Sequence, residues 1–92
     1  MNRTEILTTA NEYITKDRAA THGEAEDNFA QIAAAWTWWL NDRLEDPIDA
    51  YDVAMMMTLF KIARAKGNTS NPENPVDGCG YLALAGEIGC AD

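Results

Sequence analysis

The chain has 92 residues and a formal net charge of −8, and 47% of its residues are hydrophobic. This length supports one domain, residues 1–92, with a single modest core, and the hydrophobic fraction excludes a disordered polypeptide. The negative charge argues against general nucleic-acid binding, because phosphate backbones attract basic surfaces. The longest apolar run, VAMMMTLF, is too short to span a bilayer, and the first residues contain no apolar signal segment. We therefore expect a cytoplasmic protein with no membrane partner.

Four helices are expected, separated by polar connectors that contain glycine or proline. They span about residues 5–16, 24–43, 50–66 and 75–90. Thr4, Asp49 and Asn74 precede the first, third and fourth helices, and side chains of these types cap free backbone N–H groups. No segment alternates apolar and polar residues as a strand would. The chain is therefore predicted to be an all-α, four-helix, bundle-like domain.

The second predicted helix carries all three tryptophans of the chain. Trp36 and Trp39 belong to its apolar stripe, whereas Trp38 falls on the otherwise polar side. An exposed tryptophan usually marks a contact. We therefore expect Trp38 to lie in a subunit interface, with a platform for base stacking as the alternative.

The third predicted helix contains the segment VAMMMTLFKIA, which is apolar on nearly every side. Such a helix is central in its domain or shared across a subunit interface. One small chain cannot bury this helix together with three tryptophans. We therefore predict a homo-oligomer, a dimer or tetramer, that completes the bundle through Trp38, Met55 and Met56.

The fourth predicted helix has two contrasting sides. At about 100° per residue, Asp77 and Tyr81 fall on one side with Leu84 and Ile88. The opposite side carries only small residues, which are Cys79, Ala83, Gly86 and Cys90. Small residues allow another backbone to approach closely, so we expect this side to be a tight packing surface.

Asp77 begins the apolar side of this helix, where a carboxylate without a partner is costly. In one interpretation it satisfies N–H groups in its own first turn, or pairs with Lys61 or Arg64. In the other, Asp77, Asp52 and the acidic residues of the second helix converge on a bound cation or phosphate. Both interpretations stay open at this point.

Three stretches of the chain resemble a phage- and prophage-encoded family of small helical domains of uncharacterised function. They are DRAATHGEAEDNFAQIAAAW, DVAMMMTLFKIAR and NPVDGCGYLALAGE. The residues in matching positions are Arg18, His22, Gly23, Asn28, Phe29, Trp36, Lys61, Arg64, Asp77, Gly80 and Tyr81. The resemblance covers nearly the whole chain and implies a protein that works inside a bacterial host.

The order of helices is more distantly similar to the MazG-type all-α nucleotide pyrophosphatases. That group holds Mg²⁺ through Glu-x-x-Glu and Glu-x-x-Asp motifs, in which carboxylates one helical turn apart share the cation. Here the resemblance implies that Glu24, Asp27 and Asp77 bind Mg²⁺. The later motif departs from the pattern, because Glu73 and Asp77 are four residues apart.

Two functions follow as hypotheses, and the sequence assigns no catalytic residue to either. The first is nucleotide binding, with or without Mg²⁺-dependent pyrophosphatase-like hydrolysis. Its candidate nucleotide-binding residues are Arg18, His22, Asn28, Lys61, Arg64 and Tyr81. The alternative is a non-catalytic, acidic helical oligomer that acts as a protein-interaction or host-modulating factor. Whether the protein is an enzyme stays open.

Overall fold

The computed structural model of the chain describes residues 1–17 and 24–90. Its helical elements are α1 (Arg3–Glu12), the π-helical turn η1 (Tyr13–Asp17), α2 (Glu24–Leu40), the 3₁₀ turn η2 (Asn41–Arg43), α3 (Ala50–Gly67) and α4 (Glu73–Gly89). There is no strand in this part of the chain. The prediction of an all-α, four-helix domain is confirmed.

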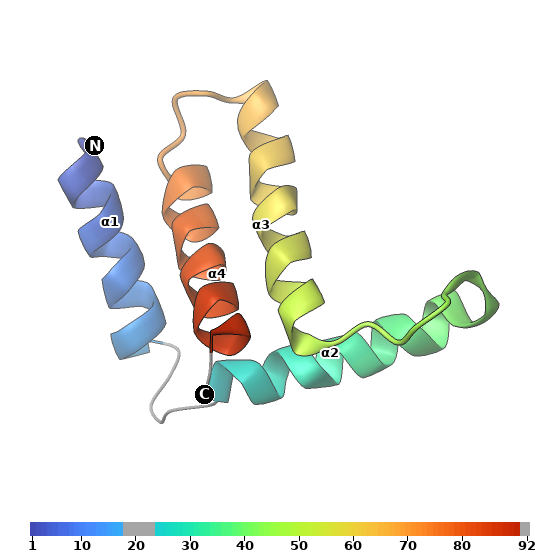
Figure 1. The fold of residues 1–92 in the computed structure, drawn as a ribbon. Helices are drawn as coiled ribbons and strands as arrows, with labels where there is room; N and C mark the ends of the chain where they lie inside the picture. Colours follow the sequence, from blue (N-terminus) through green and yellow to red (C-terminus); the bar gives the residue numbers. More distant parts are fainter. Residues whose placement is uncertain (18–23, 91–92) are drawn as a thin grey trace.

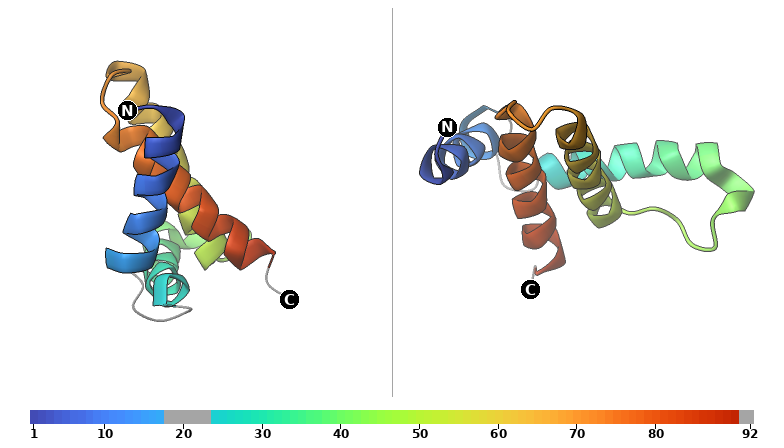
Figure 2. Two further views of the ribbon diagram at one scale, coloured as in Figure 1. Left: turned by 90° about the vertical axis from the view of Figure 1, so that its left-hand side faces the viewer. Right: turned by 90° about the horizontal axis from the view of Figure 1, so that it is seen from above.

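Three of the helices form one layer, and the fourth crosses it (Figure 1). α4 lies between α1 and α3 and contacts both. α2 passes under the lower end of α3, and its C-terminal end continues beyond α3 on the side away from α4 (Figures 1 and 2). The Cα radius of gyration is 14.1 Å, larger than the roughly 12 Å of a compact domain of this length. The projecting end of α2 contributes to this difference.

Side-chain capping sets the starts of α1 and α3. Asp49 caps α3 as predicted: it accepts from the N–H of Asp52, and Asp52 accepts from the N–H of Asp49. The prediction that Thr4 caps the first helix is wrong, because Asn2 forms the same reciprocal pair with Glu5 two residues earlier.

The predicted start of the fourth helix is also wrong. Asn71 accepts a hydrogen bond from the N–H of Glu73 at 3.0 Å, so α4 begins two residues earlier than expected. Asn74 therefore lies inside the first turn of α4, where it is buried. Its side-chain oxygen has no hydrogen-bond partner among the described residues.

The core lies where α2, α3 and α4 meet, and most of its members are small. Its buried residues are Phe29, Ala33, Ala50, Val53, Ala54 and Ala85. Trp36 packs against this cluster as expected. Trp39 does not: its side chain is 74% exposed, because α2 extends beyond α3 at this point (Figure 1).

The small-residue side of α4 does not form the expected packing surface. Ala83, Gly86 and Cys90 are exposed. Close approaches occur at two glycines instead: an added Cβ would lie 3.2 Å from Cγ2 of Ile14 in η1 at Gly80, and 2.9 Å from Cε2 of Tyr51 in α3 at Gly89. None of the helices in the described residues has the length and hydrophobicity needed to cross a membrane.

Candidate functional site

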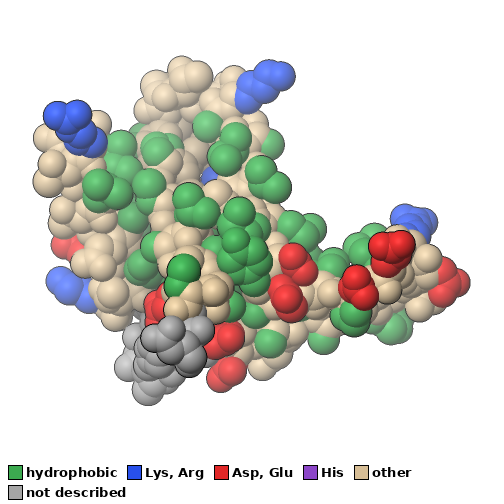
Figure 3. Space-filling model, in the orientation of Figure 1, with side chains coloured by type: hydrophobic (Ala, Val, Ile, Leu, Met, Phe, Trp, Pro, Cys, Tyr) green, Lys and Arg blue, Asp and Glu red, His purple; other side chains and the backbone are tan. Residues whose placement is uncertain are grey.

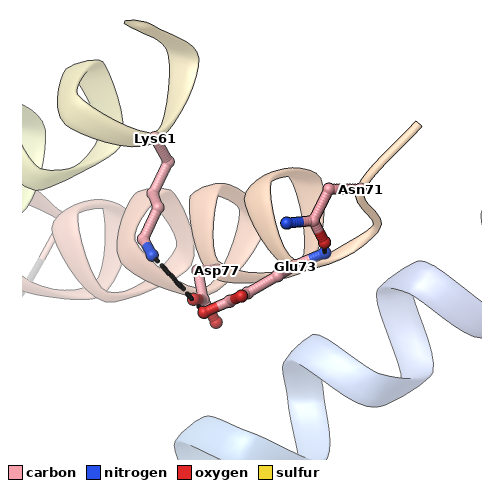
Figure 4. Close-up of polar contacts among 4 residues, drawn as sticks. All are labelled: Lys61, Asn71, Glu73 and Asp77. Carbon is pink, nitrogen blue, oxygen red and sulfur yellow. Dashed lines mark hydrogen bonds and ion pairs between the residues drawn. The ribbon is translucent and has the colours of Figure 1, made fainter. Parts of the chain in front are cut away.

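A buried lysine lies between α3 and α4. The side chain of Lys61 is 8% exposed, and its Nζ lies 3.0 Å from Oδ2 of Asp77 and 4.0 Å from Oε1 of Glu73 (Figure 4). Gly78 faces the same residue, since an added Cβ there would lie 3.8 Å from Cβ of Lys61. A buried ammonium needs such partners, because removal of a charge from water is costly.

This pair bears on the two interpretations of Asp77. The carboxylate pairs with Lys61, as the first interpretation expected. Arg64 is exposed and lies with its guanidinium carbon 5.7 Å from the centre of the Phe60 ring. Asp52 is not brought to Asp77: its carboxylate caps α3 nine residues before Lys61, which is about 13 Å along a helix.

A cavity of about 250 Å³ opens beside Asp77, between α1, η1, α2 and α4. Its walls are mostly apolar and include Ala10, Ile14, Ala25, Phe29, Ile32, Val76, Gly80 and Leu84. Four side chains add polar atoms to this wall, and they are Tyr13, Asn28, Asp77 and Tyr81. This combination, an apolar hollow with a few polar groups, is typical of small-molecule sites.

Aromatic rings form part of the cavity wall. The ring centres of Phe29 and Tyr81 are 6.2 Å apart with an angle of 47° between their planes, an arrangement that aromatic pairs favour. Tyr13 and Ile14 enter the wall from η1, and short π-helical turns are frequent at functional sites. Sequence reasoning did not name Tyr13 as a site residue. The signal that could have found it is a phenolic hydroxyl one helical turn from Ala10 and next to Ile14, which also line the cavity.

The structure brings together some of the predicted site residues and separates others. Asn28, Asp77 and Tyr81 line the cavity, whereas Lys61 does not line it and contacts only Asp77 of these three through an ion pair. Asp27 and Arg64 do not belong to the cavity wall and are exposed. Arg18 and His22 lie outside the described residues, and the side chain of Glu24 is not described.

Among the side chains that the structure describes, which do not include those of Asp17 and Glu24, no group of three His, Cys, Asp or Glu residues could hold a metal ion. The carboxylate of Asp77 is already bound to Lys61. The described donors therefore do not form a complete Mg²⁺ site by themselves.

The predicted interface residues have different environments. Trp38 is 77% exposed and Met56 is 41% exposed. Met55 packs partly against the core. Two of the three are therefore available for a contact with another chain.

Comparison with known proteins places the chain in a family. The model of the domain of unknown function DUF6378 matches residues 5–89. The Gene 55 protein of Mycobacterium phage L5 is 41% identical over 79 residues, which cover 86% of this chain and 49% of that protein. The Gene 55 protein of Mycobacterium phage D29 is 34% identical over 83 residues, which cover 90% of this chain and 52% of that protein. The chain thus spans about half the length of these two relatives.

No solved structure matches the chain. The predicted resemblance to a phage-encoded family of uncharacterised helical domains is confirmed by the family model and by both relatives. The chain is therefore a small phage-type protein and belongs to the DUF6378 family.

Proposed function

We propose that this protein binds a nucleotide and holds the base in the cavity between α1, α2 and α4. The observation that carries the proposal is the convergence of Asn28, Asp77 and Tyr81 on one hollow, although they come from two helices that are far apart in the sequence. All three are among the nucleotide-binding and metal-binding candidates that the sequence singles out.

The chemistry of the wall suits a base. A base is flat and carries N–H donors beside ring-nitrogen and carbonyl acceptors. Oδ2 of Asp77 accepts from Lys61, while Oδ1 has no partner among the described residues and can accept from a base N–H. The amide of Asn28 can donate and accept, and the rings of Phe29 and Tyr81 offer apolar faces.

The size of the cavity limits what it can enclose. Sites that bury drug-sized ligands measure about 300–1,000 Å³, and this cavity measures about 250 Å³. It has room for a base, so the sugar and phosphates would extend outside it. Lys61 is committed to Asp77, which leaves Arg18, His22 and Arg64 as the candidates for phosphate contacts.

The proposal extends from binding to hydrolysis of the bound nucleotide with Mg²⁺. It requires Glu24 and Asp27, one helical turn apart on α2, to bind the cation with the phosphates. We place the activity in the cytoplasm of the bacterial host, since Cys79 and Cys90 are free thiols of the kind that a reducing compartment preserves.

Calorimetry with a panel of nucleotides, with and without Mg²⁺, tests binding, and phosphate release on the same panel tests hydrolysis.

We expect Asp77→Asn to weaken binding by about tenfold, since a hydrogen bond to a charged group contributes about 1.5–3 kcal/mol. Asn28→Ala and Tyr81→Phe test the wall without touching the Lys61 pair. Asn11→Ala, at an exposed position outside the cavity wall, is the matched control for Asn28→Ala. Absence of heat with every nucleotide would overturn the proposal.

A second candidate function is a non-catalytic, acidic helical oligomer that acts through protein contacts, including contacts with a host factor. The exposed Trp38 and Trp39 favour it, because large exposed aromatic side chains are typical of interfaces. If this function is correct, the chain associates with itself and binds no nucleotide. Light scattering on the unmodified chain at micromolar concentration tests it, and a monomer would contradict it.

A further inference from the structure

The most exposed aromatic surface of the described residues lies on the part of the chain that projects beyond α3. We define the arm as residues 37–48: the end of α2, η2, and the segment that returns to α3. Its two ends are tied together, since the N–H of Ile48 donates to the Thr37 hydroxyl at 2.9 Å and that hydroxyl donates to the Ile48 carbonyl at 3.5 Å. At the tip, Asn41 adopts a φ of 44°, a left-handed conformation that Asn tolerates better than most residues. The arm therefore has a defined conformation that its own hydrogen bonds hold.

The arm presents a pair of tryptophans to solvent. Trp38 and Trp39 are 77% and 74% exposed, and their ring centres lie 6.3 Å apart. A tryptophan can bury on the order of 150–250 Å² and dominates the interfaces that contain it. Two adjacent exposed tryptophans therefore form a strong candidate contact surface.

A second exposed apolar surface lies on α3. We call it the outer face of α3, and its residues are Met56, Leu59 and Ile62, which are 41%, 60% and 60% exposed. Leu59 is two residues before Lys61, which is about 200° around the helix, so this face is opposite the one that contacts α4. In Figure 1 the arm leaves the foot of α3 on this same side.

The arm and the outer face of α3 therefore lie on the two sides of one open angle, which we call the angle of the chain. Figure 2 shows the same relation from above, with the arm extending away from the layer. In Figure 3 acidic side chains gather at the tip of the arm, and hydrophobic side chains lie along it towards α3. Acidic side chains also lie where the arm meets α3 (Figure 3). Each chain thus carries a projecting element with exposed tryptophans and, beside it, the exposed apolar residues of the outer face of α3.

The exposed area is large for a monomer of this size. The chain exposes 6691 Å², whereas a monomeric protein of its mass of 10.1 kDa exposes about 5,300 Å². The excess is about 1,400 Å² per chain, or about 2,800 Å² for two chains. Stable homodimer interfaces bury about 2,000–5,000 Å² in total, so one further copy of the chain accounts for the excess.

We infer that two copies of the chain form a two-fold dimer in which the arm of each copy packs into the angle of the other. A two-fold contact pairs unlike patches reciprocally, so the tryptophans of each arm cover the outer face of α3 on the partner subunit. One such contact buries both apolar surfaces of both chains. This inference supplies the interface for the second candidate function and does not depend on nucleotide binding, since no cavity residue lies on the arm.

Sedimentation equilibrium on the full chain tests the interface. We expect the unmodified chain to dimerise at micromolar concentration, and Trp38→Ala/Trp39→Ala and Leu59→Ala each to raise the dimer dissociation constant by about tenfold or more. Leu7→Ala is the matched control: Leu7 and Leu59 are both 60% exposed, and Leu7 lies on α1 at the other end of the layer. The control is expected to leave the dissociation constant unchanged.

A mixing experiment distinguishes an arm in the partner's angle from two arms that contact each other. A chain with Trp38→Ala/Trp39→Ala keeps its outer face, and a chain with Leu59→Ala keeps its arm. In the inferred dimer the mixed pair has one intact contact, so native mass spectrometry should show heterodimer well above the about twofold excess over either variant homodimer that random pairing gives. No preference for the heterodimer would overturn the arm-in-angle geometry. A monomeric unmodified chain would overturn self-association itself, and a dimer that tolerates the arm variants would overturn only this interface.

Discussion

At the scale of single residues, the ion pair of Lys61 and Asp77 is asymmetric. Lys61 is almost fully buried, with a side chain 8% exposed, whereas the side chain of Asp77 is 20% exposed. Water can therefore partly replace Lys61 as a partner of Asp77, but it cannot reach Lys61 as easily. Glu73, at 4.0 Å and more than half exposed, is a weaker substitute partner for the lysine.

This asymmetry predicts the effects of substitution on stability. Asp77→Asn leaves the buried ammonium without its main partner and should lower the free energy of unfolding by about 3 kcal/mol. Lys61→Met leaves a carboxylate with some access to water and should cost about 1–2 kcal/mol. Urea denaturation of both variants, and of the double variant, measures these costs and the coupling between the residues.

Asp42→Asn provides the control for charge alone, because Asp42 is an exposed carboxylate on η2. Its effect should stay within about 0.5 kcal/mol. Equal losses from Asp77→Asn and Lys61→Met, or costs that simply add in the double variant, would contradict the asymmetric pair.

At the scale of the elements, glycines set how closely α4 approaches its neighbours. Gly80 is buried, and an added Cβ would lie 3.2 Å from Cγ2 of Ile14. Gly86 is exposed on the same helix, with nothing within 4 Å of an added Cβ. The same substitution at the two positions therefore separates helix propensity from packing.

Alanine at these two positions should have opposite effects. Gly86→Ala should raise the free energy of unfolding by about 0.5–1 kcal/mol, because alanine loses less conformational entropy in a helix. Gly80→Ala gains the same propensity but forces η1 to shift, and should lower the free energy of unfolding by about 1 kcal/mol. Thermal unfolding followed by circular dichroism measures both, and an equal gain at Gly80 would show that η1 does not pack on α4 as described.

The helices could be predicted from the sequence because their signals are local. The helical spacing of apolar residues and the polar connectors lie within a few positions of each element, and the Asp49 cap is confirmed on this basis. The two wrong caps have the same local cause. Asn2 and Asn71 lie just upstream of the predicted caps and satisfy the first turn earlier.

The candidate site could be predicted only in part, because packing between helices decides it. Asp77 and Tyr81 are identified by their place on an apolar side of a helix, and Asn28 by the family resemblance; all three line one cavity. The choice of Lys61 over Arg64 as the partner of Asp77 depends on how α3 is rotated against α4. The exposure of Trp39 depends on where α2 leaves the layer, and periodicity within one helix carries no information on that point.

At the scale of the whole molecule, net charge opposes the inferred dimer. Each chain carries a formal charge of −8, and acidic side chains gather at the tip of the arm (Figure 3). The apolar contact between the arm and the outer face of α3 must therefore overcome repulsion between two acidic subunits. Dissolved salt screens that repulsion and leaves the apolar contact in place.

Salt should accordingly tighten the dimer. Between about 0.01 M and 1 M salt the Debye length falls from about 30 Å to about 3 Å, which removes most of the repulsion between subunits. We expect the dimer dissociation constant, measured by sedimentation equilibrium, to fall by about tenfold or more over this range. The Trp38→Ala/Trp39→Ala variant should remain weaker than the unmodified chain at every salt concentration, because it lacks the apolar contact. Weaker association at high salt would mean that ion pairs hold the subunits together, and it would exclude the apolar arm as the main source of affinity.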